Sequence, residues 1–238
     1  LRRSRAAAWG LGRPTGVDLP GERGGVVPGR AWKREFWADF RGTYCSEAAT
    51  AAPGSDVQAL YADLCDNGHR WRGGDAVNMV IGQGDVQTTP LQIANAFAAM
   101  ANGGTLWRPH VAREVIRPDG TVESVPPEAV GRLPLPPPLL DYLESGLVAV
   151  TRTGTAASVF GDFPLAVAGK TGTAEIRPKQ PFAWFAAYAP AEAPRYVVVV
   201  MVEEGGSGSQ TAAPIVRRIL EGLLGLEQTA ITPGLRTD

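Results

Sequence analysis

The last third of the chain carries three apolar runs of strand length, at residues 165–176, 182–189 and 195–204. The runs are separated by the short segments RPKQP and PAEAP, which are rich in the turn former proline. Connections this short join neighbouring strands as hairpins, because a parallel pair needs a crossover of about a dozen residues or more. The pattern therefore predicts an antiparallel sheet of three strands.

Apolar residues also recur at helical spacing in three segments around the predicted strands. The first begins after Thr89, a residue type that caps helices, has Pro90 at its first position and ends before Gly103. The second covers residues 139–150 and the third covers residues 213–225. Helices that flank an antiparallel sheet in separate layers define an α+β fold.

The first half of the chain has weaker periodic signals. Residues 10–30 are dense in glycine and proline, which predicts an ordered loop. Residues 31–73 have no clean period except for one short helix at 56–65, and we interpret them as an insertion. A polar, proline-rich connection is predicted at 117–138.

The composition is that of a folded globular protein, with 44% hydrophobic and 20% charged residues in a chain of 238. The formal net charge of −1 gives no electrostatic support for nucleic-acid binding. No apolar stretch reaches the ~18 residues that a transmembrane helix needs, so we expect no transmembrane segment here. The chain begins with Leu1 rather than methionine, which indicates a piece of a longer protein.

Two cysteines, Cys45 and Cys65, lie in the predicted insertion. Zinc sites favour closely spaced pairs such as C-x-x-C, which the chain lacks, so the sequence predicts no metal site. Two interpretations stay open: a disulfide, if the protein is exposed to an oxidising compartment, or two unpaired thiols.

The segment AGKTGTAEI, residues 168–176, matches parts of two kinds of active site. A phosphate-binding P-loop has the pattern G-x-x-x-x-G-K-[ST], and Pro164 occupies the position of its first glycine. A P-loop also leads into a helix, whereas this segment leads into another predicted strand. The spacing argues against a nucleotide hydrolase, and we expect no cofactor. The alternative is the K-T-G element of penicillin-recognising serine transpeptidases and β-lactamases.

Beyond this tripeptide, several longer segments occur in the order found in class B penicillin-binding proteins, particularly the elongation-type enzymes of rod-shaped bacteria. The chain resembles the transpeptidase domain of that family, which implies the penicillin-binding transpeptidase or β-lactamase-like fold, present here in part. The matching segments are GLGRPTGVDLPGE (10–22), GDAVNMVIGQGDVQTTPLQIANAFAAMANGGTLWRPHV (74–111), AGKTGTAE (168–175), AWFAAYAP (183–190) and TAAPIVRRILEGLL (211–224).

The resemblance implies serine acyl transfer, in which a serine attacks the bond between two D-alanines of a peptidoglycan stem peptide. It places Lys170 in the catalytic cleft, where the charge favours the substrate carboxylate, and gives Thr171 a hydrogen bond to that carboxylate. It assigns the backbone N–H of Thr173 to the oxyanion hole. Gly172 has no side chain, so a substrate backbone can approach the strand closely.

A further expectation concerns the positions of Lys170 and Thr171 on the predicted strand. We expect Lys170 to lie on an inner strand of the sheet, facing a groove that receives the anionic end of a peptide. Strand alternation places Lys170 and Gly172 on one face and Thr171 and Thr173 on the other. Sheet twist and an edge position would be needed to bring the Thr171 hydroxyl to the groove, where the peptide would add as a strand.

The family's S-x-x-K and S-x-N elements have no counterpart in the sequence. Both would precede residue 1, so we interpret residues 1–238 as the C-terminal part of a single transpeptidase domain. Ser46 and Ser158 are candidate substitutes for the nucleophile, but no base stands at a recognisable spacing from either. We therefore expect this chain alone to be inactive and to form no adduct with a labelled penicillin.

The leading hypothesis is a fragment of a penicillin-binding D,D-transpeptidase that acts in cell-wall elongation at the extracytoplasmic face of the bacterial membrane. Its expected partners are stem peptides ending in D-Ala-D-Ala, β-lactam antibiotics and cell-wall elongation proteins. A second hypothesis is a non-catalytic binding or scaffold module that retains the K-T-G cleft. An upstream gene sequence encoding S-x-x-K and S-x-N would select the enzyme.

Overall fold

The computed structural model of the chain describes residues 3–176 and 179–229. Contacts divide it into two compact units: one comprises residues up to Ala6 with Val26–Gln87, and the other comprises Ala7–Gly25 with residues from Thr88 onward. No described helix has the length and apolar character needed to cross a membrane. The elements are α1 (Arg3–Ala8), α2 (Arg30–Thr50), α3 (Asp56–Asn67), α4 (Gly73–Val80), α5 (Pro90–Ala101), β1 (Thr105–Trp107), β2 (Glu114–Ile116), β3 (Val122–Ser124), β4 (Ala129–Arg132), α6 (Pro137–Arg152), α7 (Ala157–Phe160), β5 (Ala168–Ala174), β6 (Phe182–Ala189), β7 (Tyr196–Val202), a π-helical turn (Gly208–Ala212) and α8 (Ala213–Leu224).

The second unit is built on an antiparallel sheet in the order β5–β6–β7. Each neighbouring pair of strands is joined without a register shift. The three strands expected at 165–176, 182–189 and 195–204 are therefore confirmed, although β5 and β7 are shorter than expected. Residues 177–178, in the predicted connection between the first two strands, lie outside the described residues.

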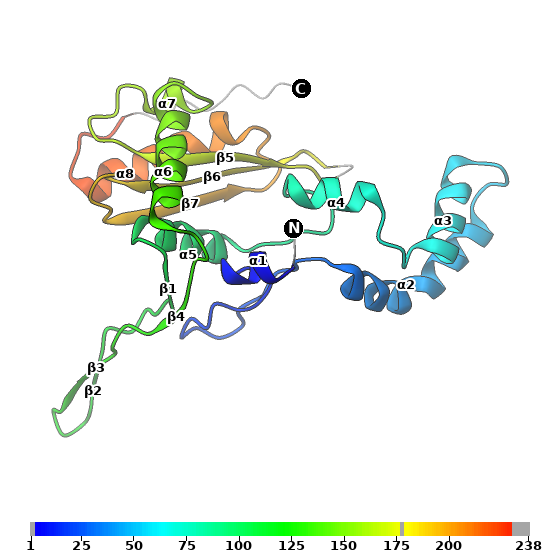
Figure 1. Cartoon of the computed structure of the whole chain (residues 1–238), viewed down its shortest axis with the longest axis horizontal. Helices are drawn as coiled ribbons and strands as arrows, with labels where there is room; N and C mark the ends of the chain where they lie inside the picture. Colours follow the sequence, from blue (N-terminus) through cyan, green and yellow to red (C-terminus); the bar gives the residue numbers. More distant parts are fainter. Residues whose placement is uncertain (1–2, 177–178, 230–238) are drawn as a thin grey trace. The chain divides into compact units, whose positions relative to one another are not determined.

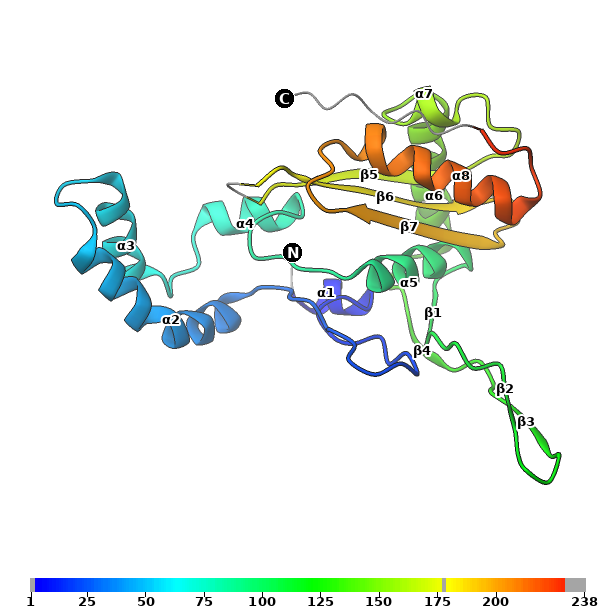
Figure 2. The same cartoon turned by 180° about the vertical axis from the view of Figure 1, so that it is seen from behind.

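Helices cover both faces of this sheet: α8 lies on one face, and α5 and α6 lie on the other (Figures 1 and 2). The core on the α8 side contains Phe160, Phe185 and Leu220, which are almost inaccessible to solvent. The core on the opposite side contains Ala168 and Tyr188 and packs against α5 and α6. The α+β layering expected from the sequence is confirmed.

The helix ends follow from local chemistry. At the start of α5, the Thr89 hydroxyl accepts from the Gln92 N–H at 3.2 Å, and the Gln92 side chain accepts from the Thr89 N–H at 3.0 Å. This capping box satisfies two N–H groups that have no partner within the helix. At the end of α8, Gly225 takes the left-handed conformation with a φ of 70°. Both ends agree with the sequence prediction.

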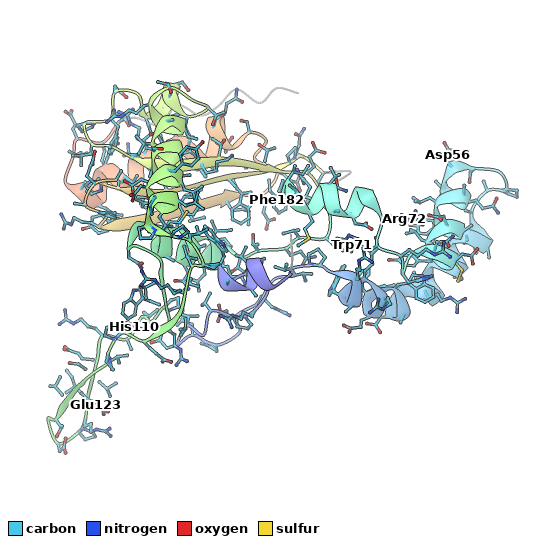
Figure 3. All side chains as sticks on the ribbon, in the orientation of Figure 1. Asp56, Trp71, Arg72, His110, Glu123 and Phe182 are labelled. Carbon is cyan, nitrogen blue, oxygen red and sulfur yellow. A yellow bond between two sulfur atoms is a disulfide. The ribbon has the colours of Figure 1, made fainter. Side chains whose placement is uncertain are left out.

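Two small antiparallel pairs, β1 with β4 and β2 with β3, were not expected from the sequence. The polar, proline-rich connection predicted at 117–138 therefore contains two short strands, β3 and β4, that were not predicted. The β2–β3 hairpin projects away from the layered part of the second unit, with His110 near its base and Glu123 on β3 (Figure 3). Every residue of β2 and β3 is exposed, so no alternation of buried and exposed positions marks these strands.

The first unit departs most from the prediction. Residues 31–73 were expected to hold one short helix, but they also hold most of the 21-residue helix α2. Neither α2 nor α3 contains a buried residue, so no apolar stripe gives α2 a clear period. A disulfide between Cys45 and Cys65 joins the two helices, and the Trp37 indole N–H donates to the Leu64 carbonyl at 2.8 Å.

Candidate functional site

The K-T-G element lies on β5, an outer strand of the described sheet. The expectation of an inner strand for Lys170 is therefore wrong, because two successive hairpins leave the first strand with only one neighbour. The Lys170 side chain is exposed, and its ammonium donates to the Thr171 carbonyl at 2.6 Å. A strand edge beside a lysine offers backbone hydrogen-bond groups and positive charge to an extended anionic peptide.

A second hydroxyl accompanies the K-T-G threonine. The Thr171 hydroxyl oxygen lies 3.0 Å from that of Thr155, which belongs to the turn between α6 and α7. When Thr155 donates this hydrogen bond, the Thr171 proton stays available for a ligand, because each hydroxyl has one proton and accepts as well. Nothing in the sequence marked Thr155, because the contact joins residues 16 positions apart through the fold.

Two glycines bring backbone segments into direct contact at this strand. A Cβ atom on Gly172 would lie 3.1 Å from the Cβ of Trp184, so this glycine has a packing role. Gly208 begins the π-helical turn and is packed more tightly. A Cβ atom there would lie 2.3 Å from the Trp184 carbonyl oxygen and 2.4 Å from that of Gly172. The turn is thus seated on the backbones of β5 and β6, a contact that the sequence analysis missed.

Helix α6 fixes the sheet from the other end of β5. The buried Thr151 hydroxyl donates to the Val167 carbonyl, just before the strand, at 2.6 Å. On β6, the buried Tyr188 hydroxyl donates to the Glu144 carboxylate at 3.0 Å. Burial, and then this hydrogen bond, raise the pKa of Tyr188 well above its usual value, so the hydroxyl remains a donor into the alkaline range.

The remaining candidate residues lie on other elements. Ser158 lies on α7 and Ser46 on α2, and neither hydroxyl is hydrogen-bonded to a basic side chain in the described ranges. Cys45 and Cys65 form the disulfide, so neither is a free thiol. Residues 3–176 and 179–229 contain no cluster of three or more His, Cys, Asp or Glu side chains suited to a metal ion. The arrangement around β5 offers an exposed ammonium, a pair of hydroxyls and a strand edge, which are groups that suit an anionic peptide.

Comparison with known proteins gives a consistent result. A family model described as penicillin binding protein transpeptidase domain matches residues 2–221. The peptidoglycan D,D-transpeptidase MrdA of Haemophilus influenzae is 27% identical over 233 residues, which cover 90% of this chain and 31% of that protein.

Solved structures show the same likeness. The structure of Pseudomonas aeruginosa PBP2 in complex with WCK 5153 aligns with a TM-score of 0.70 and 30% identity, over 96% of this chain and 44% of that chain. The imipenem acyl-enzyme complex of penicillin-binding protein A from Mycobacterium tuberculosis aligns with a TM-score of 0.63 and 29% identity, over 93% of this chain and 41% of that chain. The chain thus spans less than half of each of these proteins.

Proposed function

The chain belongs to the penicillin-binding protein transpeptidase domain family, and from this membership we propose that the protein carrying it is a serine-type peptidoglycan D,D-transpeptidase. In this reaction a serine takes the acyl group of one stem peptide, releasing its terminal D-alanine, and passes the acyl group to an amine of a neighbouring stem peptide. The observation that carries the proposal is the K-T-G element on an outer strand, with a cation and paired hydroxyls beside it.

Each residue of the K-T-G strand then has a role. Lys170 makes the catalytic cleft positive, and the Thr171 hydroxyl, held by Thr155, donates to the substrate carboxylate. Gly172 allows the substrate backbone to approach the strand. The backbone N–H of Thr173 is one donor of the oxyanion hole, which stabilises the negative oxygen that develops during attack. The nucleophilic serine comes from a part of the protein outside this chain.

In this proposal, residues 1–238 are the C-terminal part of a single transpeptidase domain, and residues 31–73 are an insertion in it. The family match covers residues 2–221, which include that segment, and a disulfide within it suits an oxidising compartment. The protein then works at the extracytoplasmic face of the bacterial membrane. Its partners are stem peptides ending in D-Ala-D-Ala, β-lactam antibiotics and cell-wall elongation proteins, a choice supported by the similarity to MrdA and to an imipenem acyl-enzyme.

Intact-mass spectrometry after incubation with a labelled penicillin tests the proposal. The longer protein that contains this chain should gain one adduct, and the 238-residue chain alone should gain none. In the longer protein, Lys170→Ala should slow acylation roughly 100-fold or more, because a preorganised charge at the reacting centre is lost. Lys179→Ala is the matched control, because that lysine is exposed and pairs with Glu204 at 3.4 Å.

Each contrary outcome has a defined meaning. A longer protein that carries S-x-x-K and S-x-N but forms no adduct would contradict the enzyme assignment and favour the non-catalytic binding module. An adduct on the 238-residue chain would contradict the placement of the nucleophile outside it. Equal acylation rates of Lys170→Ala and Lys179→Ala would contradict the proposed role of Lys170 in the reaction.

A further inference from the structure

A cavity of about 280 Å³ lies within the second unit, and none of the residues assigned to acyl transfer lines it. Its walls come from the loop at residues 10–16, from α5, from the β1 strand and the residue after it, and from β4. Arg13 and Arg108 are its charged side chains, Asn95 adds an amide, and Leu106 and Val130 are apolar. Two cations therefore lie beside an aliphatic surface in one pocket that is open to solvent, and both arginine side chains are exposed.

The loop wall of this cavity is fixed by hydrogen bonds. The Gln92 side chain, which is only 1% exposed, donates to the carbonyls of Arg13 and Gly24 at 2.7 Å each. The Glu22 carboxylate accepts from the N–H and the hydroxyl of Thr15 at 2.6 and 2.7 Å. The cavity is thus shaped before a ligand arrives, which reduces the ordering that binding would require.

The charge of the lining favours an anion. The described residues that line the cavity include no carboxylate. Arg108 pairs with Glu128 at 2.7 Å, but both side chains are about half exposed, at 48% and 54%, so water screens this pair. The Arg13 guanidinium has no hydrogen-bond or ion-pair partner within residues 3–176 and 179–229. The two acidic residues that follow the loop already have partners: Glu22 accepts from Thr15, and Asp18 accepts from the backbone N–H groups of Val111 and Ala112.

We propose that this cavity binds a small aliphatic carboxylate, of the size of the C-terminal residue of a short peptide. Arginine presents a planar fork of N–H donors that matches a carboxylate, and Leu106 and Val130 provide a surface for an aliphatic side chain. The cavity volume, about 280 Å³, is slightly below the usual range for ligand sites, roughly 300–1,000 Å³, so the cavity suits one or two residues better than a nucleotide.

Calorimetric titration with N-acetylalanine tests this site in the longer protein, acylated beforehand with penicillin so that carboxylate binding at β5 is blocked. We expect a dissociation constant on the order of 1 mM, at the weak end of the affinity scale, because the arginines are exposed to water. N-acetylalaninamide, which lacks the charge, should not bind, and Arg13→Gln should weaken N-acetylalanine binding at least roughly tenfold. If a tripeptide ending in alanine binds as tightly as N-acetylalanine, the ligand is the C-terminus of a peptide. If the tripeptide does not bind, the ligand is a free small acid.

Controls separate this site from the proposed acyl transfer. Arg113→Gln, at a side chain 88% exposed and outside the cavity, should leave N-acetylalanine binding unchanged. Arg13→Gln should leave the rate of penicillin acylation unchanged. If penicillin does not acylate the protein, the same titration on untreated protein still measures how the affinity for N-acetylalanine depends on Arg13. Equal binding of acid and amide, or unchanged affinity in Arg13→Gln, would overturn the proposal.

Discussion

Replacing Gly208 with alanine should destabilise the second unit, because the added methyl group has no space. Its Cβ atom would lie 2.3 Å from the Trp184 carbonyl oxygen, 2.4 Å from the Gly172 carbonyl oxygen and 3.0 Å from the Gly172 nitrogen. Non-bonded heavy atoms rest at about 3.5–4.0 Å, so the turn or the strand must move by about 1 Å. All three neighbours are backbone atoms, and no change of rotamer removes them.

The expected magnitude follows from the cost of overpacking, which is typically about 1–3 kcal/mol. We expect a loss near the upper end, ~3 kcal/mol, because the obstruction is rigid backbone on two paired strands. For a protein of this size, each kcal/mol shifts the melting temperature by roughly 2–4 °C, so Tm should fall by about 6–12 °C. Gly146→Ala in α6 is the control, because a Cβ atom there meets nothing within 4 Å. It should be neutral or stabilising by about 0.5–1 kcal/mol.

Thermal and urea unfolding of the two variants give the comparison directly. In the longer protein, Gly208→Ala should also slow penicillin acylation, because the displaced turn rests on the K-T-G strand at Gly172. Gly146→Ala should react at the wild-type rate. If Gly208→Ala unfolds at the same temperature as wild type, the turn is not seated on the sheet as described, and its proposed support of β5 is refuted.

Three further predictions rest on other contacts. Reduction of the Cys45–Cys65 disulfide should expose α2 and α3 to hydrogen exchange while the β5–β7 sheet stays protected. Neither helix buries a residue, and a cross-link over a loop of this size contributes roughly 3 kcal/mol to stability. Uniform loss of protection across both units would contradict this prediction. The raised pKa of Tyr188 means that its contribution to stability is complete below the usual tyrosine value of ~10 and is lost as the pH rises further. Tyr188→Phe should therefore cost about 1 kcal/mol at pH 7 and show a shallower alkaline loss in urea unfolding than wild type. Burial alone would raise the pKa of Glu221, but hydrogen bonds from Arg217 and Thr229 lower it, so its stabilising effect should disappear as the pH falls below about 4.5. Glu221→Gln should flatten that acid dependence in urea unfolding, whereas the exposed Glu227→Gln should not.

How far the fold could be predicted depends on where side chains are buried. The three C-terminal strands place apolar residues against the core on each face of the sheet, α8 against one and α5 and α6 against the other, and that burial imposes the period that predicts them. Helix α2 and the β2–β3 hairpin bury no residue, and neither was predicted. Helix α3 buries none either, and it was predicted only because its apolar residues recur at helical spacing. The pairing of Cys45 with Cys65 depends on two helices lying side by side, which residue spacing does not specify.

The candidate site shows the same limit at the scale of single contacts. The motif itself supplied the residue types, a lysine, a threonine and a glycine on one strand, but not the strand's place in the sheet. Among the described residues β5 has one strand neighbour, so its orientation depends on contacts from elsewhere in the chain: Thr151 at its start, Thr155 at its middle and Gly208 against Gly172.

None of those three residues follows a period or belongs to the K-T-G element, and each acts through a turn or a helix end. A side chain on an outer strand has fewer neighbours to fix it, so these contacts decide where the Thr171 hydroxyl points. Loss of any one of them should therefore alter the proposed carboxylate binding at β5 while leaving the K-T-G sequence intact, which makes the turns around the strand as much a part of the proposed site as the motif.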